Sequence, residues 1–182
     1  PTRRSSDLAA LVLFTTSCLT VEKKTYTFKM KNDGSGILTI DYYNIYSSQS
    51  DDAEDESQQD FDDLINTYIN GDEIEKTYPG TDVVKKELYE VNGKLCGTVK
   101  IKFDDYRDVK LYRYNNSGPY MLQLNSMNES YVEGNGHYGG ENMNVIFWNE
   151  NEKTLNVVSS VTEPTESDVT LIDKWRTWEK NK

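Results

Sequence analysis

The side chains best suited to chemistry in this 182-residue chain are a single histidine, His137, and two cysteines, Cys18 and Cys96. Acid–base and nucleophilic catalysis need a positioned base. His137 lies in the stretch EGNGHYGG, which has neither a Gly-x-Ser-x-Gly motif nor the frame of a phosphate-binding loop. Paired carboxylates could serve a glycosidase, but with 31 acidic residues some pair is always available. We therefore expect no catalytic residues, no cofactor and no metal site, and a protein that is not an enzyme.

Cys18 follows an apolar run, residues 8–14, and three small residues. The run is too short to span a bilayer, which takes about 20 residues, but it suits the apolar region of a secretory signal peptide with Arg3 and Arg4 ahead of it. A cysteine directly after small residues resembles a bacterial lipoprotein signal, in which the thiol is acylated and the preceding segment is removed. We predict that Cys18 is the acylated N-terminus of the mature protein, although Thr15 stands where such signals usually have an aliphatic residue.

Residues 1–17 are accordingly interpreted as the remnant of a signal peptide, and residues 18–182 as a single envelope domain. Within the remnant, PTRRSSDL (residues 1–8) is what a common sequencing adaptor encodes, so we interpret it as an assembly artefact that hides the true start. The alternative is that residues 8–14 form a buried strand and that Cys18 is an ordinary core cysteine.

The charge of the chain restricts its partners. Twenty basic residues stand against 31 acidic ones, a formal net charge of −11. Such a charge disfavours nucleic acid, whose phosphates it repels, and electrostatic docking on anionic lipid. We therefore expect membrane attachment through the N-terminal lipid and a location in the bacterial cell envelope, periplasmic or surface-exposed.

Alternation of large apolar and polar residues predicts two β-hairpins. One spans residues 24–43 with Asp-Gly at 33–34, and the other spans residues 87–103 with Asn-Gly at 92–93. Both dipeptides favour two-residue turns in which each residue has a positive φ. Further short strands are predicted at 110–114, 120–124, 143–148 and 154–161.

A helix is predicted over residues 58–70, because apolar residues recur there with helical spacing along one face. Ser57 and Asp60 resemble a capping box at its start. The acidic segment 47–57 precedes it. Clustered carboxylates there could bind Ca²⁺, but the spacing and glycine of an EF-hand loop are absent, so we interpret the segment as a solvated loop. The glycine-rich segment 133–140 is interpreted as a flexible connection.

A second helix is predicted over residues 168–179, with Ser167 or Asp168 as its N-cap. The fold class predicted is α+β, an antiparallel, hairpin-rich curved sheet with one or two covering helices, and Cys96 is expected to be a small buried hydrophobe in a strand. The residues expected to be buried are Phe28, Leu38, Ile40, Leu64, Ile65, Val99, Ile101 and Phe103.

Thirteen tyrosines are the one compositional excess. A tyrosine ring is apolar while its hydroxyl forms hydrogen bonds. Tyr42, Tyr43, Tyr68 and Tyr89 come from elements expected to pack beside one another, so they predict a ligand site at the mouth between the sheet and its covering helix. The alternative is that they only complete the core and its rim.

The order of a lipoprotein cysteine, a strand, KNDGSGILTIDY, a helix and NGKLCGTVKIKF is similar to that of the LppM-like bacterial envelope lipoproteins. The likeness rests on Cys18, on residues 33–36 and, more loosely, on residues 97–103, and it covers about the first half of the chain. It implies a non-enzymatic α+β domain of curved sheet and helix that contacts lipid or glycolipid.

Together these features favour a non-catalytic, lipid-anchored envelope protein that binds a hydrophobic or glycolipid ligand or a protein partner. Two alternatives stay open: a structural or assembly lipoprotein without a ligand, and an envelope hydrolase.

Overall fold

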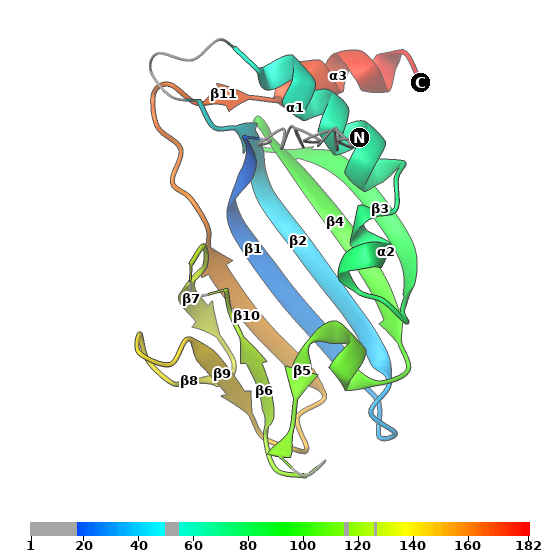
Figure 1. Cartoon of the computed structure of the whole chain (residues 1–182), viewed down its shortest axis with the longest axis vertical. Coiled ribbons are helices and arrows are strands. Elements are labelled where there is room, and N and C mark those ends of the chain that lie inside the picture. Colours follow the sequence, from blue (N-terminus) through cyan, green and yellow to red (C-terminus); the bar gives the residue numbers. More distant parts are fainter. Residues whose placement is uncertain (1–17, 50–54, 115–116, 126) are drawn as a thin grey trace, which may run out of the picture.

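The computed structural model of the chain describes residues 18–49, 55–114, 117–125 and 127–182. The fold is α+β, with two antiparallel sheets and helices over one end of the larger sheet (Figure 1). The larger sheet has the order β3-β4-β2-β1-β10-β7, with β11 also paired to β2. Its strands are β1 (Leu19–Met30), β2 (Gly36–Ser47), β3 (Asp82–Val91), β4 (Lys94–Phe103), β7 (Ser130–Gly134), β10 (Thr154–Ser160) and β11 (Val169–Thr170).

The smaller sheet has the order β5-β6-β9-β8 and packs against the lower part of the larger one (Figure 1). Strands predicted at 110–114, 120–124, 143–148 and 154–161 are confirmed as β5, β6, β9 and β10. The strands of the smaller sheet are β5 (Leu111–Tyr112), β6 (Tyr120–Gln123), β8 (His137–Tyr138) and β9 (Val145–Trp148).

The hairpin predicted over residues 24–43 is confirmed as β1 and β2, but its turn differs from the prediction. Gly34 has a φ of 86°, whereas Asp33 has no positive φ. The Lys31 N–H donates to the Ser35 carbonyl at 2.8 Å, which closes a longer loop. The Asp33 carboxylate accepts from the backbone N–H and the hydroxyl of Ser35, and these local bonds hold Asp33 outside the left-handed region that a two-residue turn requires.

The hairpin predicted over residues 87–103 is confirmed as β3 and β4. Asn92 and Gly93 have φ of 52° and 77°, as the predicted turn needs. The predicted core is confirmed too, since every residue expected inside is buried: Phe28, Leu38, Ile40, Leu64, Ile65, Val99, Ile101 and Phe103.

The helix predicted over residues 58–70 forms as α1 (Ser57–Asp63), which continues directly into a π-helix, η1 (Leu64–Ile69). The predicted capping box is wrong. The N-cap residue is Glu56, whose side chain forms no capping hydrogen bond, and the Asp55 carboxylate accepts from the Ser57 N–H at 2.9 Å. Asp60 is 2% exposed and its carboxylate accepts instead from the Ser47 hydroxyl and from the Cys18 N–H. The carboxylate therefore ties the helix to the ends of β1 and β2 rather than to its own first turn.

The second predicted helix forms as α3 (Ile172–Lys180), and its predicted caps are also wrong. Leu171 occupies the N-cap position. The Asp168 carboxylate accepts from the backbone N–H groups of Gln49 and Thr165, at 2.9 and 2.7 Å, and the Ser167 hydroxyl donates to the Gln49 carbonyl. Both side chains thus fix the segment just before β11 against residue 49. Two short helices were not predicted: α2 (Glu73–Thr77) and the 3₁₀ helix η2 (Tyr106–Val109).

The glycine-rich segment 133–140 is not a free connection, contrary to the prediction. It contributes to β7 in the larger sheet and to β8 in the smaller one. A Cβ on Gly134 would lie 2.5 Å from the Asn156 carbonyl, so glycine is needed where the backbones approach closely. Between them, the Asn135 side chain accepts from Trp148 Nε1 and from the Asn156 N–H, both at 2.8 Å. This amide joins the two sheets.

Two hydrophobic clusters result. The lower cluster lies between the two sheets and includes Phe28, Leu38, Ile101, Leu122 and Trp148. The upper cluster lies between the larger sheet and the helices α1, η1 and α3, and includes Val21, Ile45, Phe61, Leu95 and Leu171. Tyr42 of β2 packs against both clusters. The face of the larger sheet is partly uncovered at the place where the two clusters meet.

Candidate ligand-binding cavity

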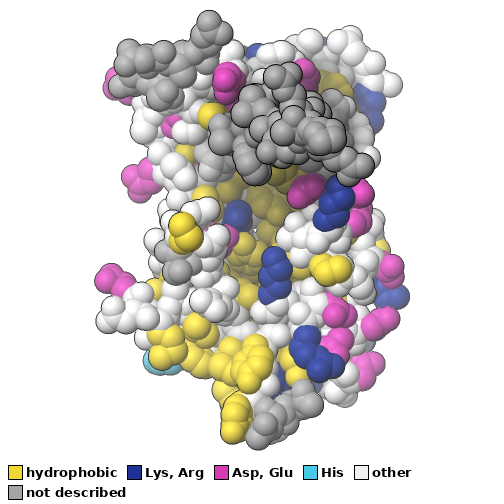
Figure 2. Space-filling view, in the orientation of Figure 1, with side chains coloured by type: hydrophobic (Ala, Val, Ile, Leu, Met, Phe, Trp, Pro, Cys, Tyr) yellow, Lys and Arg dark blue, Asp and Glu magenta, His cyan; other side chains and the backbone are white. Residues whose placement is uncertain are grey.

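A cavity of about 520 Å³ lies on the larger sheet where the two clusters meet. Strands β1, β2, β3 and β4 form its floor, helices η1 and α2 form one wall, and residues 122–125 and 128–129 form the opposite wall. In the space-filling view it is a hollow with hydrophobic side chains at the bottom and cationic ones beside it (Figure 2). Its volume falls within the roughly 300–1,000 Å³ of small-molecule sites.

An irregularity in β2 shapes the floor. Tyr42 and Ile45 both line the cavity, although residues three apart in a regular strand face opposite sides. Between them Asn44 has a φ of 55°, a left-handed conformation that shifts the alternation by one residue. The Asn44 amide donates to Glu22 at 3.0 Å, which holds this conformation.

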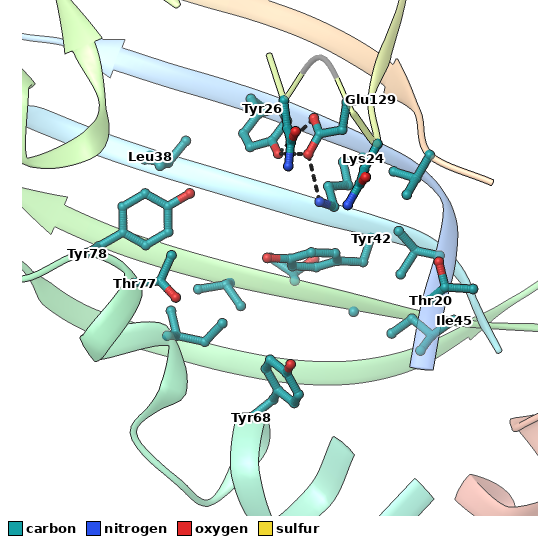
Figure 3. Close-up of a pocket in the computed structure, with 18 of the residues that line it drawn as sticks. Thr20, Lys24, Tyr26, Leu38, Tyr42, Ile45, Tyr68, Thr77, Tyr78 and Glu129 are labelled. Carbon is teal, nitrogen blue, oxygen red and sulfur yellow. Dashed lines mark hydrogen bonds and ion pairs between the residues drawn. The ribbon is translucent and has the colours of Figure 1, made fainter. Parts of the chain in front are cut away.

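A polar cluster stands at one side of the cavity around the Glu129 carboxylate (Figure 3). Lys24 Nζ donates to it at 2.8 Å, the Tyr26 hydroxyl at 3.1 and 3.2 Å, and the Ser159 hydroxyl at 3.0 Å. The Glu129 side chain is 7% exposed and that of Lys24 is 25% exposed. A buried carboxylate needs such partners to offset its lost hydration. Burial, together with the Glu129 charge, raises the pKa of Tyr26 far above its usual range, so its hydroxyl stays protonated and donates.

Three more tyrosines surround the hollow (Figure 3). Burial raises the pKa of Tyr78 to about 12 and raises that of Tyr42 further still. Burial also raises the pKa of Tyr68, which stands at the rim with 36% of its surface exposed. All three are therefore neutral hydroxyls at ordinary pH. Lys110, another lining residue, holds its ammonium 4.9 Å from the centre of the Tyr78 ring.

Two of the four tyrosines predicted for the ligand site line the cavity. Tyr42 and Tyr68 line the cavity at the predicted junction of sheet and helix. The prediction is wrong for Tyr43 and Tyr89, which do not line it. Tyr43 directly follows Tyr42, and Tyr89 directly follows Leu88. Because Tyr42 and Leu88 line the cavity, strand alternation turns Tyr43 and Tyr89 to the opposite face of the sheet. There the Lys94 ammonium lies 5.0 Å from the Tyr43 ring, and the Tyr89 hydroxyl accepts from Thr98.

Sequence reasoning missed Lys24, Tyr26, Tyr78, Lys110 and Glu129. One signal was available for the first two, because Lys24 and Tyr26 share the strand phase of the buried Phe28. A lysine in the inward phase of a strand indicates a buried polar partner. No local sequence pattern indicated Glu129, because its partner Lys24 is 105 positions away in the sequence.

Cys18 lies partly buried just before β1. Its N–H donates to Asp60 Oδ1 at 3.1 Å and its carbonyl accepts from the Ser48 N–H at 2.9 Å. Burial, Asp60 and Glu56 all raise the pKa of its thiol. Its acylation remains a prediction, and the apolar run at 8–14 lies outside the described residues. Cys96 is buried in β4, as predicted.

His137 is exposed on β8, opposite Phe147 in the strand pairing. Within the described ranges, no three His, Cys, Asp or Glu side chains come together in a group that could hold a metal ion. Over the same ranges, no helix has the length and apolar character needed to cross a membrane. Residues 50–54 of the predicted solvated loop fall outside those ranges.

Comparisons with known protein families, with curated proteins and with solved structures each find no match for this chain. The resemblance to LppM-like lipoproteins therefore stays a prediction.

Proposed function

We propose that the protein is a non-catalytic binding protein for a hydrophobic or amphipathic small molecule, of which a lipid or glycolipid is the leading class. The observation behind this proposal is the cavity of about 520 Å³, whose apolar floor adjoins a gathered set of polar groups. Small-molecule sites are mostly apolar concavities in which a few polar groups fix the orientation of the ligand.

The apolar floor can supply most of the affinity. Burying one methylene contributes about 0.8 kcal/mol, so ten of them contribute on the order of 8 kcal/mol before the cost of association is subtracted. The polar groups then orient the ligand rather than hold it.

The arrangement around Glu129 favours binding over catalysis. Its carboxylate accepts from Lys24, Tyr26 and Ser159, so its lone pairs are engaged within the protein. A general base must instead have a lone pair within reach of a substrate proton. An envelope hydrolase, the alternative, would need Glu129 to exchange these partners for substrate.

We also propose that Cys18 is acylated and attaches the domain to an envelope membrane. An attached domain meets lipid at high effective concentration, which would fill even a weak site. Labelling of cells with radioactive palmitate tests this: the wild-type protein should be labelled and Cys18→Ala should not. Labelling of the Cys18→Ala protein would overturn the anchor and would leave the cavity proposal intact.

A cavity-filling substitution tests the binding proposal. Leu88 lines the cavity from β3, whereas the next residue, Tyr89, lies on the opposite face of the strand. We expect Leu88→Trp to weaken binding of 1-anilinonaphthalene-8-sulfonate, followed by its fluorescence, at least tenfold, and Tyr89→Trp to leave it unchanged. Equal binding by the two variants, each with a cooperative thermal unfolding transition, would contradict the proposal. A structural or assembly lipoprotein without a ligand would then remain.

A further inference from the structure

We infer that the cavity selects a ligand with one acyl chain and an anionic oxygen headgroup, a carboxylate or a phosphate. This inference rests on the proposed function and specifies the class of ligand.

The volume favours one chain. One water molecule occupies roughly 30 Å³ in the liquid, and a methylene group is of similar size. A cavity of about 520 Å³ therefore has room for on the order of 17 such groups. That is the size of one long acyl chain with a small headgroup, and a ligand with two long chains would leave much of its apolar surface outside.

The headgroup follows from which hydrogen-bonding groups remain available. The main acceptor in the cavity, the Glu129 carboxylate, is occupied by Lys24, Tyr26 and Ser159. The Lys24 ammonium has three N–H donors, and the only hydrogen bond found for it among the described residues uses one of them. The neutral hydroxyls of Tyr42 and Tyr78 also line the cavity and can donate (Figure 3). The remaining N–H groups of the Lys24 ammonium can only donate, so they favour a headgroup that accepts hydrogen bonds.

The charge in the cavity points the same way. Lys110 lines it and forms no ion pair with any residue that the structure describes. Of the lining carboxylates, Glu129 is paired with Lys24, and Glu87 is paired with Lys85 at 2.5 Å. The lining therefore holds two lysines and two glutamates, and Lys110, exposed at the rim, is the one of these four side chains without an ion pair among the described residues. An anion is attracted to this charge, and an ammonium headgroup is repelled by it.

Four probes with the same chain test the selection: hexadecanoate, hexadecyl phosphate, hexadecan-1-ol and hexadecylamine. Each competes with 1-anilinonaphthalene-8-sulfonate on the purified full-length protein at pH 8. We expect at least one of the two anions to bind about tenfold more tightly than the alcohol, as one added charged hydrogen bond would give, and the amine to bind most weakly. The order of the two anions tells carboxylate from phosphate recognition. Alcohol or amine binding as tightly as both anions would overturn the inference, whereas failure of all four probes would count against the proposed function itself.

Variants at two lysines locate the effect. Lys110→Met removes the unpaired charge without exposing a buried partner, and Lys100→Met is the control, because Lys100 is exposed on β4 next to the inward-facing Val99. We expect Lys110→Met to weaken binding of the preferred anion about tenfold and to leave hexadecan-1-ol unchanged, with Lys100→Met like the wild type. Equal losses for anion and alcohol in Lys110→Met, or equal losses in both variants, would overturn the assignment.

Discussion

The lower and upper halves of the larger sheet are covered in different ways. In the lower half a second sheet covers it, and polar groups between the sheets are satisfied, as where the Asn135 side-chain oxygen accepts from Trp148 Nε1 and from the Asn156 N–H. In the upper half short helices cover it, and two buried polar atoms, Ser57 Oγ and Trp175 Nε1, have no hydrogen-bond partner among the described residues. The π-helical turn η1 belongs to this upper half, and such turns occur frequently at functional sites. The polar groups of the lower half are thus satisfied within the protein, whereas the upper half is less completely satisfied, and the cavity lies where the two halves meet.

The largest effect on stability is expected when a buried phenylalanine is replaced by alanine, and each half of the sheet offers one such residue. Phe28 lies in the lower cluster and Phe61 in the upper one, and both are buried. We expect Phe28→Ala to lower the free energy of unfolding by about 4–5 kcal/mol and Phe61→Ala by about 3 kcal/mol, because the cost of a cavity depends on how far its surroundings can collapse. Urea unfolding of the two variants measures this. A larger loss for Phe61→Ala would reverse the comparison.

The polar cluster should be the next most sensitive feature. Lys24→Met leaves the buried Glu129 carboxylate without its cation, so we expect a loss of about 3 kcal/mol in the free energy of unfolding. Adding Glu129→Gln to the same protein should recover part of that loss, because no buried charge is then left unpaired. Chemical denaturation of the single and double variants measures the coupling, and simple additivity would mean that the pair does not interact.

Alkaline pH should weaken the fold through the tyrosines that line the cavity. The pKa of Tyr78 is raised to about 12 in the folded protein, against about 10 in an unfolded chain. The stabilisation is therefore complete below pH 10 and is lost as the pH rises from about 10 to about 12, because the unfolded state loses its proton first. Tyr78→Phe should flatten this part of the stability profile, measured by denaturation at several pH values. An unchanged slope would contradict the assigned burial.

The smallest effect is expected at the single histidine. His137 is exposed on β8 and lies outside the cavity. We expect His137→Ala to change the free energy of unfolding by less than about 0.5 kcal/mol and to leave ligand binding intact. A loss of function at unchanged stability would revive the enzyme alternative.

Much of the fold could be predicted from local patterns. Period-two alternation located the hairpins and the buried Phe28 and Ile101, because one buried face imposes that pattern directly. The caps failed because Asp60 and Asp168 bond to distant strands and loops instead of to their own helices. Local sequence does not show which of two possible partners a side chain chooses.

The site was predictable only in part, for the same reason. A cavity lies at the predicted junction of sheet and helix, and Tyr42 and Tyr68 line it. Neighbours in a strand face opposite ways, which should have separated Tyr43 from Tyr42. The left-handed Asn44 and the pairing of Lys24 with Glu129 depend on tertiary contacts that leave no local pattern.

Native mass spectrometry is the most direct test of the central claim, that the space between the two halves of the sheet holds a ligand. The Cys18→Ala protein, which lacks the proposed lipid anchor, would be purified without detergent from cells that make it, alongside Cys18→Ala/Leu88→Trp, in which the cavity is filled. We predict a bound species with the mass of one single-chain amphiphile on Cys18→Ala and its absence from the double variant. A Cys18→Ala protein that carries no small molecule under these conditions, or a double variant that carries the same one, would contradict the account.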